Sequence, residues 1–518
     1  MAQPAAPRRG WTWPVAAIAL LVLVVAALLA MHWDKTVTAA AFTDARGNQT
    51  MLRNFLYRMP KGGDLHVHLS GGVYAERYIA WAIADKLCVQ VRTASIVNRP
   101  VDKDKNTLPC GQAPGLLPID EAVGTVDTPA KQQLYDRIVN ALSMRDFRPT
   151  AAEPTGHDHF FAAFGKFSAA AGPRFTDMIV DQLAYYGAQS AQYVELMTSF
   201  SSFGEREGFV QAIAGKADYG SKLDALNAAG LAAFIAQKKE ELDDATAEVD
   251  KKRDCDSQKT KPGCMVTYRF IAQVSRNGTL DDVFVQTAIA AAMVRADPMV
   301  VAFNYVQAED AAVARTDYSE HMRIAAYLAS NSPGAKRVNV TLHAGELWLG
   351  LVPPADLTFH IYEAVTVAGA QRIGHGVDLA FENRLDDLLS VMRRKKVAVE
   401  INLSSNDQIL GVRGNEHPFP AYRAAGVPVV LSTDDAAVER IDLTNEYVRA
   451  ARDYGLDYAT LKAIARASLT YSFLDEASKQ NELKRFDALS AAFEHAMAAR
   501  ASLLADLGLI VKAEFGRR

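Results

Sequence analysis

Two histidines, His66 and His68, stand two residues apart in the apolar run "DLHVHL". Residues at positions i and i+2 of a β-strand project from the same face of that strand. Two neutral imidazoles on one face can bind one metal ion, because imidazole nitrogen is a good ligand for zinc and its neighbouring metals. So short a motif is weak support by itself, since a core histidine held by a hydrogen bond gives the same pattern.

Further groups of the same chemistry follow later in the chain. His343 and Glu346 lie in "TLHAGE", His375 lies in "RIGHG", and Asp434 and Asp435 lie in "LSTDD". Three histidines and one carboxylate form a typical ligand set for a catalytic divalent ion. These residues predict a metal site, provided that the fold brings their segments together.

The segments that contain these residues are short, mostly apolar and rich in β-branched side chains. Helical periodicity between them predicts alternating strands and helices, and eight such units predict a closed (β/α)8 TIM barrel. Catalytic groups of this fold lie at the C-terminal ends of the strands, where the histidines and carboxylates fall. An open doubly wound sheet is the alternative, but no Gly-rich phosphate loop follows the first strand. The eight segments are residues 64–70, 193–199, 267–275, 299–307, 337–346, 371–376, 397–406 and 427–435.

The long connection after the first strand, about residues 84–160, is rich in Pro, Asp and Lys and predicts an inserted subdomain. The four cysteines form two local pairs, and no C-x-x-C spacing is present in the sequence, which argues against a structural zinc site. In an oxidising compartment we expect the disulfides Cys88–Cys110 and Cys255–Cys264, with four free thiols as the alternative.

Residues 11–33 contain no Asp, Glu, Lys or Arg. They are long enough to cross a bilayer as a helix, which takes about 20 apolar residues. We expect a transmembrane signal-anchor, with residues 1–10, which include Arg8 and Arg9, in the cytoplasm. Residues 34–518 would then form the barrel domain outside the cytoplasm, at the inner cell membrane. "TAAAF" at residues 38–42 could instead be a cleavage site, and the protein would then be secreted.

The composition fits one large globular domain with insertions, at 518 residues, 49% hydrophobic and 22% charged. A formal net charge of -4 gives no basic surface overall and argues against a nucleic-acid partner. The oligomeric state is not fixed by the sequence, and a homodimer is one option.

Five segments resemble, in order and spacing, the motifs of the adenosine deaminase family: "MPKGGDLHVHLSGG", "LHAGE", "RIGHG", "INLSSN" and "LSTDD". The resemblance covers about residues 50–480 and looks greatest to the secreted, growth-factor-related branch, because of the extracytoplasmic placement and the cysteine-paired insertion. It implies a (β/α)8 barrel with one zinc ion per chain, bound by His66, His68, His343 and Asp434. The H-x-E and P-C-x-x-C motifs of the cytidine deaminases are absent from the sequence.

The resemblance also implies a reaction, the hydrolytic removal of the 6-amino group from adenosine or 2′-deoxyadenosine to give inosine or 2′-deoxyinosine and ammonia. Glu346 would donate a proton to ring N1, His375 would orient the attacking water, and Asp435 would bind ring N7. His68 would contact the substrate as well.

Two departures from the family pattern bear on the substrate. Ser70 stands where the family often has an aspartate that contacts the ribose, and Gln307 stands where the family has a glycine whose backbone meets the base. These departures leave a deaminase of another purine derivative as one alternative. The resemblance to the growth-factor-related branch leaves a non-catalytic adenosine-binding or signalling relative as another. AMP is disfavoured, because no Arg/Lys cluster accompanies the strand ends.

A second H-x-H pattern occurs at His157 and His159, but it leads into the helical pattern "FFAAFGKF". We expect these histidines to be surface or capping residues. Phe160, Phe161 and Phe164 are expected to belong to the core and not to the wall of a substrate site, although the resemblance implies an apolar helix over the adenine near this point.

Overall fold

Eight parallel strands form the centre of the molecule, which a computed structural model describes over residues 12–331 and 337–515. Each strand falls on one of the eight predicted segments, and neighbours along the sheet follow the order of the chain. The strands are β1 (Gly63–His68), β5 (Tyr193–Thr198), β6 (Thr267–Ser275), β7 (Val300–Val306), β8 (Asn339–Ala344), β9 (Arg372–His375), β10 (Ala398–Ile401) and β11 (Val429–Leu431).

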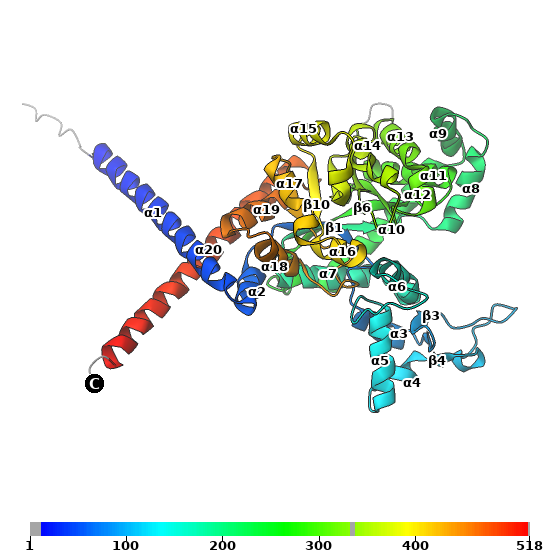
Figure 1. Cartoon of the computed structure of the whole chain (residues 1–518), viewed down its shortest axis with the longest axis horizontal. Helices are drawn as coiled ribbons and strands as arrows, with labels where there is room; N and C mark the ends of the chain where they lie inside the picture. Colours follow the sequence, from blue (N-terminus) through cyan, green and yellow to red (C-terminus); the bar gives the residue numbers. More distant parts are fainter. Residues whose placement is uncertain (1–11, 332–336, 516–518) are drawn as a thin grey trace, which may run out of the picture.

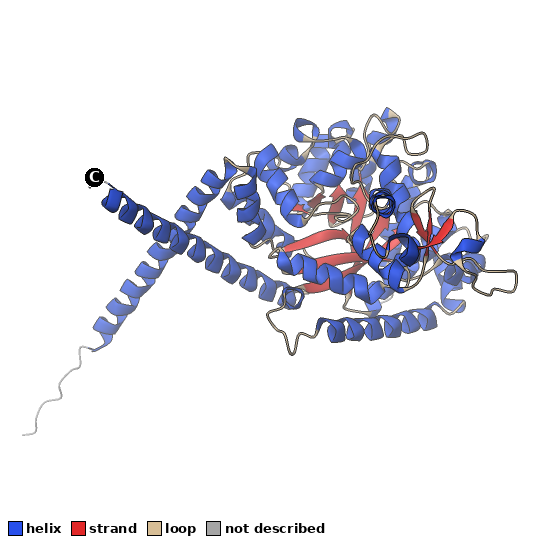
Figure 2. Cartoon of the chain, turned by 90° about the horizontal axis from the view of Figure 1, so that it is seen from below, coloured by secondary structure: helices blue, strands red, loops and turns tan. Residues whose placement is uncertain are grey.

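The first and last strands meet, so the sheet curves into a barrel. The backbone N–H of His68 donates to the carbonyl of Asp434 (3.1 Å), and the N–H of Asp434 donates to the carbonyl of His66 (2.9 Å). Every residue of β7 and β9 is buried, as expected for strands covered on both faces. Helices surround the strands in both views (Figures 1 and 2). The predicted (β/α)8 TIM barrel is confirmed.

The main barrel helices are amphipathic segments between the strands. After β1 and β5 come α7 (Phe175–Ala188), α8 (Phe203–Ile213), α9 (Tyr219–Ala228) and α10 (Leu231–Arg253). After β6 to β9 come α11 (Leu280–Ala296), α12 (Ala312–Thr316), α13 (Tyr318–Ser330), α14 (His360–Thr366) and α15 (Leu385–Lys395). The last group is α16 (Leu403–Leu410), α17 (Phe419–Ala424), α18 (Leu443–Asp453) and α19 (Tyr458–Thr470).

The connection between β1 and β5 contains a small antiparallel sheet of its own, with the strand order β3-β2-β4. Both predicted disulfides, Cys88–Cys110 and Cys255–Cys264, are present. The domain boundaries drawn from the sequence stay predictions. The elements of this region are α3 (Ala75–Ala84), β2 (Cys88–Gln90), β3 (Ser95–Val97), β4 (Leu116–Pro118), α4 (Ile119–Val123), α5 (Pro129–Ala141) and α6 (Gly156–Ala171).

Two long helices, α1 (Thr12–Arg46) and α20 (Glu476–Phe515), cross each other and extend away from the barrel (Figures 1 and 2). By length and composition, α1 could span a membrane, and its apolar residues such as Leu21 are exposed. The end of α1 differs, because Phe42 is buried and its ring packs edge-on against Phe55 of α2 (Gln49–Arg58) at 5.4 Å. The predicted cytoplasmic residues 1–10 lie outside the described part of the chain.

Candidate active site with a metal-binding cluster

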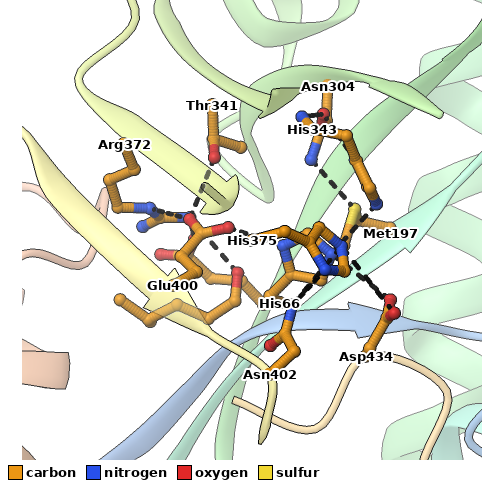
Figure 3. Close-up of polar contacts among 12 residues, drawn as sticks. His66, Met197, Asn304, Thr341, His343, Arg372, His375, Glu400, Asn402 and Asp434 are labelled. Carbon is orange, nitrogen blue, oxygen red and sulfur yellow. Dashed lines mark hydrogen bonds and ion pairs between the residues drawn. The ribbon is translucent and has the colours of Figure 1, made fainter. Parts of the chain in front are cut away.

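The four predicted metal ligands meet at the C-terminal end of the barrel. One ligand atom from each of His66, His68, His343 and Asp434 lies within 4.8 Å of the others. Asp434 Oδ1 lies 3.3 Å from His66 Nε2 and 3.2 Å from His68 Nε2. The side chains come from β1, β8 and the residues after β11, so the closing of the barrel brings them together (Figure 3).

The outward nitrogens of the three histidines are each held by a polar side chain of another strand. His66 Nδ1 lies 2.6 Å from Glu400 Oε2, and His343 Nδ1 lies 3.0 Å from Asn304 Oδ1. His68 Nδ1 lies 2.6 Å from the Gln273 amide. Partners that accept, such as Glu400 Oε2 and Asn304 Oδ1, leave Nε2 of the histidine free for a metal. For His68 the same tautomer requires the oxygen of the Gln273 side-chain amide, and not Nε2, to face Nδ1.

These contacts decide whether the residues fit a metal ion. Since Nδ1 of His66 and of His343 face acceptors, both Nδ1 atoms are donors, and both Nε2 atoms carry lone pairs when the rings are neutral. The two Nε2 atoms are only 3.0 Å apart, and the buried Asp434 Oδ1 beside them has no hydrogen-bond partner. Lone pairs that converge with an unpartnered carboxylate oxygen favour a shared cation. The donor set fits zinc.

Buried ion pairs between Arg372 and two glutamates hold the hydrogen-bond partner of His66 in place. Arg372 Nε donates to Glu400 Oε1 (2.6 Å), and Arg372 Nη2 binds Glu195 Oε2 (2.5 Å). Burial raises the pKa of Glu400, but Arg372 and His66 bring it down to about 2. Glu400 therefore remains an ionised acceptor for His66 (Figure 3).

Glu346 and His375 lie beside the four predicted ligands, and each of the two side chains has its own contacts. Glu346 Oε1 is buried without a hydrogen-bond partner, 3.4 Å from His375 Nδ1. Asn406 Nδ2 donates to His375 Nδ1 (2.9 Å), which leaves Nε2 to bear the proton and face Asp434 Oδ2 at 3.8 Å. Burial and the carboxylates of Asp434 and Glu309 raise the pKa of Glu346 well above its usual value. A carboxyl in this state can act as a general acid.

The backbone at the site is strained in ways that place side chains. His375 (φ 68°), Asp434 (φ 61°) and Gln307 (φ 78°) all adopt the left-handed conformation, which is unusual for residues other than glycine and is common at functional sites. At Gly71, a Cβ atom would lie 1.5 Å from Asp435 Oδ1. Only glycine therefore allows Asp435 its place beside β1.

A cavity of about 300 Å³ opens onto the cluster. Its walls contain all the predicted substrate contacts, His68, Ser70, Gln307 and Asp435, together with Glu346. The remaining lining residues are Phe160, Phe161, Phe164, Gln273, Ser275, Val306, His343 and Asp434.

Two expectations about α6 are right only in part. Phe160 belongs to the core as predicted and is 2% exposed, but it also lines the cavity. Phe160, Phe161 and Phe164 line the cavity, because α6 packs its aromatic face over the barrel mouth. His159 is buried and not at the surface, but it is a capping residue: its Nε2 lies 3.0 Å from the Asn140 carbonyl in the last turn of α5 and 2.9 Å from the Ser143 carbonyl. The periodicity showed an apolar face but not the element that this face covers.

Sequence reasoning missed the residues behind the ligands. Glu400, Asn304 and Gln273 are single polar residues in otherwise apolar strands, in "VAVEI", "VVAFNYV" and "FIAQV". A lone polar side chain in a strand buried on both faces needs a partner, and this was the available signal.

Comparison with known proteins agrees with this geometry. Residues 239–489 match the adenosine deaminase family. This segment belongs to that family. The chain is 31% identical over 147 residues to the adenosine deaminase of Vibrio atlanticus, which is 28% of this chain and 41% of that protein. It is 35% identical over 134 residues to the aminodeoxyfutalosine deaminase of Streptomyces coelicolor, 26% of this chain and 34% of that protein. The chain thus spans less than half the length of these curated relatives.

Solved structures agree on the fold of the chain. An Arabidopsis ADAL structure complexed with IMP aligns with a TM-score of 0.53 at 17% identity, covering 85% of this chain and 99% of that one. The Arabidopsis N6-mAMP deaminase MAPDA aligns with a TM-score of 0.51 at 17% identity, covering 84% and 99%. At this identity the likeness is one of fold alone.

Proposed function

We propose that this protein is a zinc-dependent aminohydrolase that removes the 6-amino group of a purine nucleoside such as adenosine or 2′-deoxyadenosine. The observation that supports it most is the convergence of His66, His68, His343 and Asp434 beside Glu346 and His375. His68, His343, Asp434, Glu346 and Asp435 of this group line one cavity. Metal-ligand groups alone would be compatible with storage or structure. An unpartnered, buried carboxyl beside them is what a proton-transfer reaction requires.

Each residue of the chain would have a separate task. His66, His68, His343 and Asp434 would hold zinc, which supplies a water of lowered pKa for attack on C6. The Nε2–H of His375 would orient the attacking water. Glu346 would donate its proton to ring N1, and Asp435 would fix the base through N7. Ammonia would then leave, and the product would be a 6-oxopurine nucleoside.

The lining of the cavity supports a neutral substrate. None of the described residues that line it is Lys or Arg, so a phosphate group would meet no cation there. Ser70 and Gln307 add polar groups where the family pattern differs, which keeps another purine derivative as the second candidate.

One assay tests these proposals together. Ammonia release by the zinc-loaded protein is measured with adenosine, 2′-deoxyadenosine, adenine, AMP and aminodeoxyfutalosine. We expect turnover of the two nucleosides and little turnover of AMP. Release from none of the five compounds would refute the proposed activity, and release from AMP in preference to adenosine would refute the substrate class.

We also propose that α1 stays attached as a membrane anchor, with the barrel outside the cytoplasm. The alternative cleavage site at residues 38–42 lies inside a continuous helix. Thr38 and Phe42 are buried there, and Thr38 Oγ1 donates to the carbonyl of Glu494 on α20. Cleavage would remove part of the folded domain. The disulfides support an oxidising location.

A further inference from the structure

A buried carboxylate outside the predicted site binds the turn that contains Glu346. Glu309 lies after β7 and is 2% exposed. Its Oε1 accepts the backbone N–H of Gly345 (3.0 Å), and its Oε2 accepts the backbone N–H of Glu346 (3.0 Å). His360 Nδ1 lies 2.6 Å from Oε1 and donates to it. Glu309 thus satisfies two adjacent backbone donors of one tight turn.

The surroundings of Glu309 keep its carboxylate in place. Arg276 Nη1 lies 3.8 Å from Oε2, and the His360 ring stacks on Tyr318 with centroids 3.7 Å apart. Although burial raises the pKa of Glu309, the hydrogen bond and charge of His360 and the charge of Arg276 bring it below its usual value. A buried charge is tolerated only when it is hydrogen-bonded in this way.

The turn that contains Gly345 and Glu346 is closely packed against its neighbours. Gly345 has φ +75°, and a Cβ atom there would lie 2.3 Å from Asp378 Oδ1. Loss of the Glu309 bonds would leave two buried N–H groups without acceptors, so the turn would have to move.

His343, the predicted metal ligand that precedes this turn, is held by other side chains. Asn304 Oδ1 accepts both the backbone N–H of His343 (2.9 Å) and its Nδ1–H (3.0 Å). Arg276 Nη2 also donates to the His343 carbonyl (2.8 Å). Asn304 thus holds His343 and Glu309 holds the turn at Glu346, while Arg276 contacts both the His343 carbonyl and Glu309.

We infer that Glu309 is a positioning residue, which aims the Glu346 carboxyl at the substrate without taking part in metal binding. This inference rests on the proposed deaminase function. It makes a specific demand: disturbing Glu309 must impair the work of Glu346 and leave the metal site intact.

The test is a double-mutant cycle of Glu309→Gln with Glu346→Gln in the full-length, zinc-loaded protein. The amide that Glu309→Gln introduces can accept only one of the two N–H groups, because its own NH2 group would face the other. We expect Glu309→Gln to lower kcat roughly 10- to 100-fold, to change KM by less than about 3-fold and to keep one zinc per chain. In the Glu346→Gln background, the same change should alter kcat by less than about 3-fold, because the group that it positions is gone.

The matched control is Glu382→Gln. Glu382 is another buried carboxyl group that accepts a backbone N–H, that of Tyr362 at 2.9 Å, but it does not bind the Glu346 turn. Its variant should keep wild-type kcat. His360→Phe serves if Glu309→Gln does not fold, because it retains a ring to stack on Tyr318 and removes one donor to Glu309. It should lower kcat less, with zinc retained.

The possible outcomes distinguish a failure of the positioning role of Glu309 from a failure of the proposed deaminase function. An active wild type with an equally active Glu309→Gln variant overturns the positioning role alone. Zinc loss in proportion to kcat, or the same fold-loss in both backgrounds, overturns it too. A zinc-loaded wild type that releases ammonia from no purine refutes the proposed function, and the positioning role fails with it.

Discussion

At the scale of single residues, the proposed metal binding and the proposed proton transfer would fall to different side chains. The four ligands converge on one point, whereas Glu346 Oε1 has no hydrogen-bond partner and lies beside His375. A group that acts mainly in the transition state affects turnover more than ground-state binding.

Glu346→Gln tests this division. The amide keeps the shape of the side chain but cannot deliver a proton, so kcat should fall roughly 100-fold or more. Zinc content, and affinity for a ground-state purine ligand by calorimetry, should change little. Because the pKa of Glu346 is raised, the decline of wild-type activity with its deprotonation should come at a higher pH than for an ordinary carboxyl, and the variant should lack this decline. Loss of zinc in the variant would place Glu346 among the ligands instead.

Gly71→Ala tests how closely Asp435 must approach β1. The added Cβ would lie 1.5 Å from Asp435 Oδ1 and 2.7 Å from its Cβ, so Asp435 or the backbone must shift. We expect kcat/KM to fall roughly 10-fold or more, with a stability loss of about 1–3 kcal/mol in denaturant unfolding. Gly208→Ala on α8 is the control, since nothing lies within 4 Å of its added Cβ. Unchanged activity in Gly71→Ala would mean that Asp435 is not tightly placed.

At the scale of elements, the strands and their order could be predicted, because alternation with amphipathic helices is a strong local signal. The same holds for the ligands, which lie in the last residues of β1 and β8 or just after β11. Asn304 and Glu400 could not be assigned as partners of histidines, since pairing across the barrel depends on register. Periodicity alone could not place the α6 phenylalanines at the cavity, because the docking of a helix is a tertiary contact.

Buried carboxyls between helices make stability depend on pH. Burial raises the pKa of Glu446 on α18 to about 7, despite its bonds to Ser404 of α16. The folded state therefore holds a proton that the unfolded state loses above its ordinary pKa of 4.5, and stability is lost as pH rises from about 4.5 to 7. This contribution is about 3 kcal/mol. Glu446→Gln should flatten that decline in unfolding curves measured from pH 5 to 8. An unaltered pH dependence would show that Glu446 is ionised in the folded protein.

At the scale of the whole molecule, α1 joins a lipid-compatible half to a half that packs on the barrel. Leu21 and Trp33 are 62% and 65% exposed, whereas Phe42 is 1% exposed. Composition could predict the first half, but the packing of the second half needed the fold.

The topology can be measured with an alkaline phosphatase fusion after residue 60 in a bacterial host. Arg8 and Arg9 should hold the N-terminus inside, so the fusion should be active. Mass spectrometry of the membrane fraction should find a chain that still contains residues 12–46. An inactive fusion would show that residue 60 lies in the cytoplasm and contradict the predicted orientation. A chain beginning near residue 42 would establish cleavage.

The central claim is that one metal ion, held by these four side chains, supports deamination. The most direct measurement is ammonia release from adenosine by the same preparation as purified, after chelation, and after zinc is restored, with metal content determined at each stage. The account predicts about one zinc per chain, loss of activity with the metal and recovery with it, and no recovery in His343→Ala. Full activity in the metal-free protein, or wild-type zinc content in His343→Ala, would contradict it.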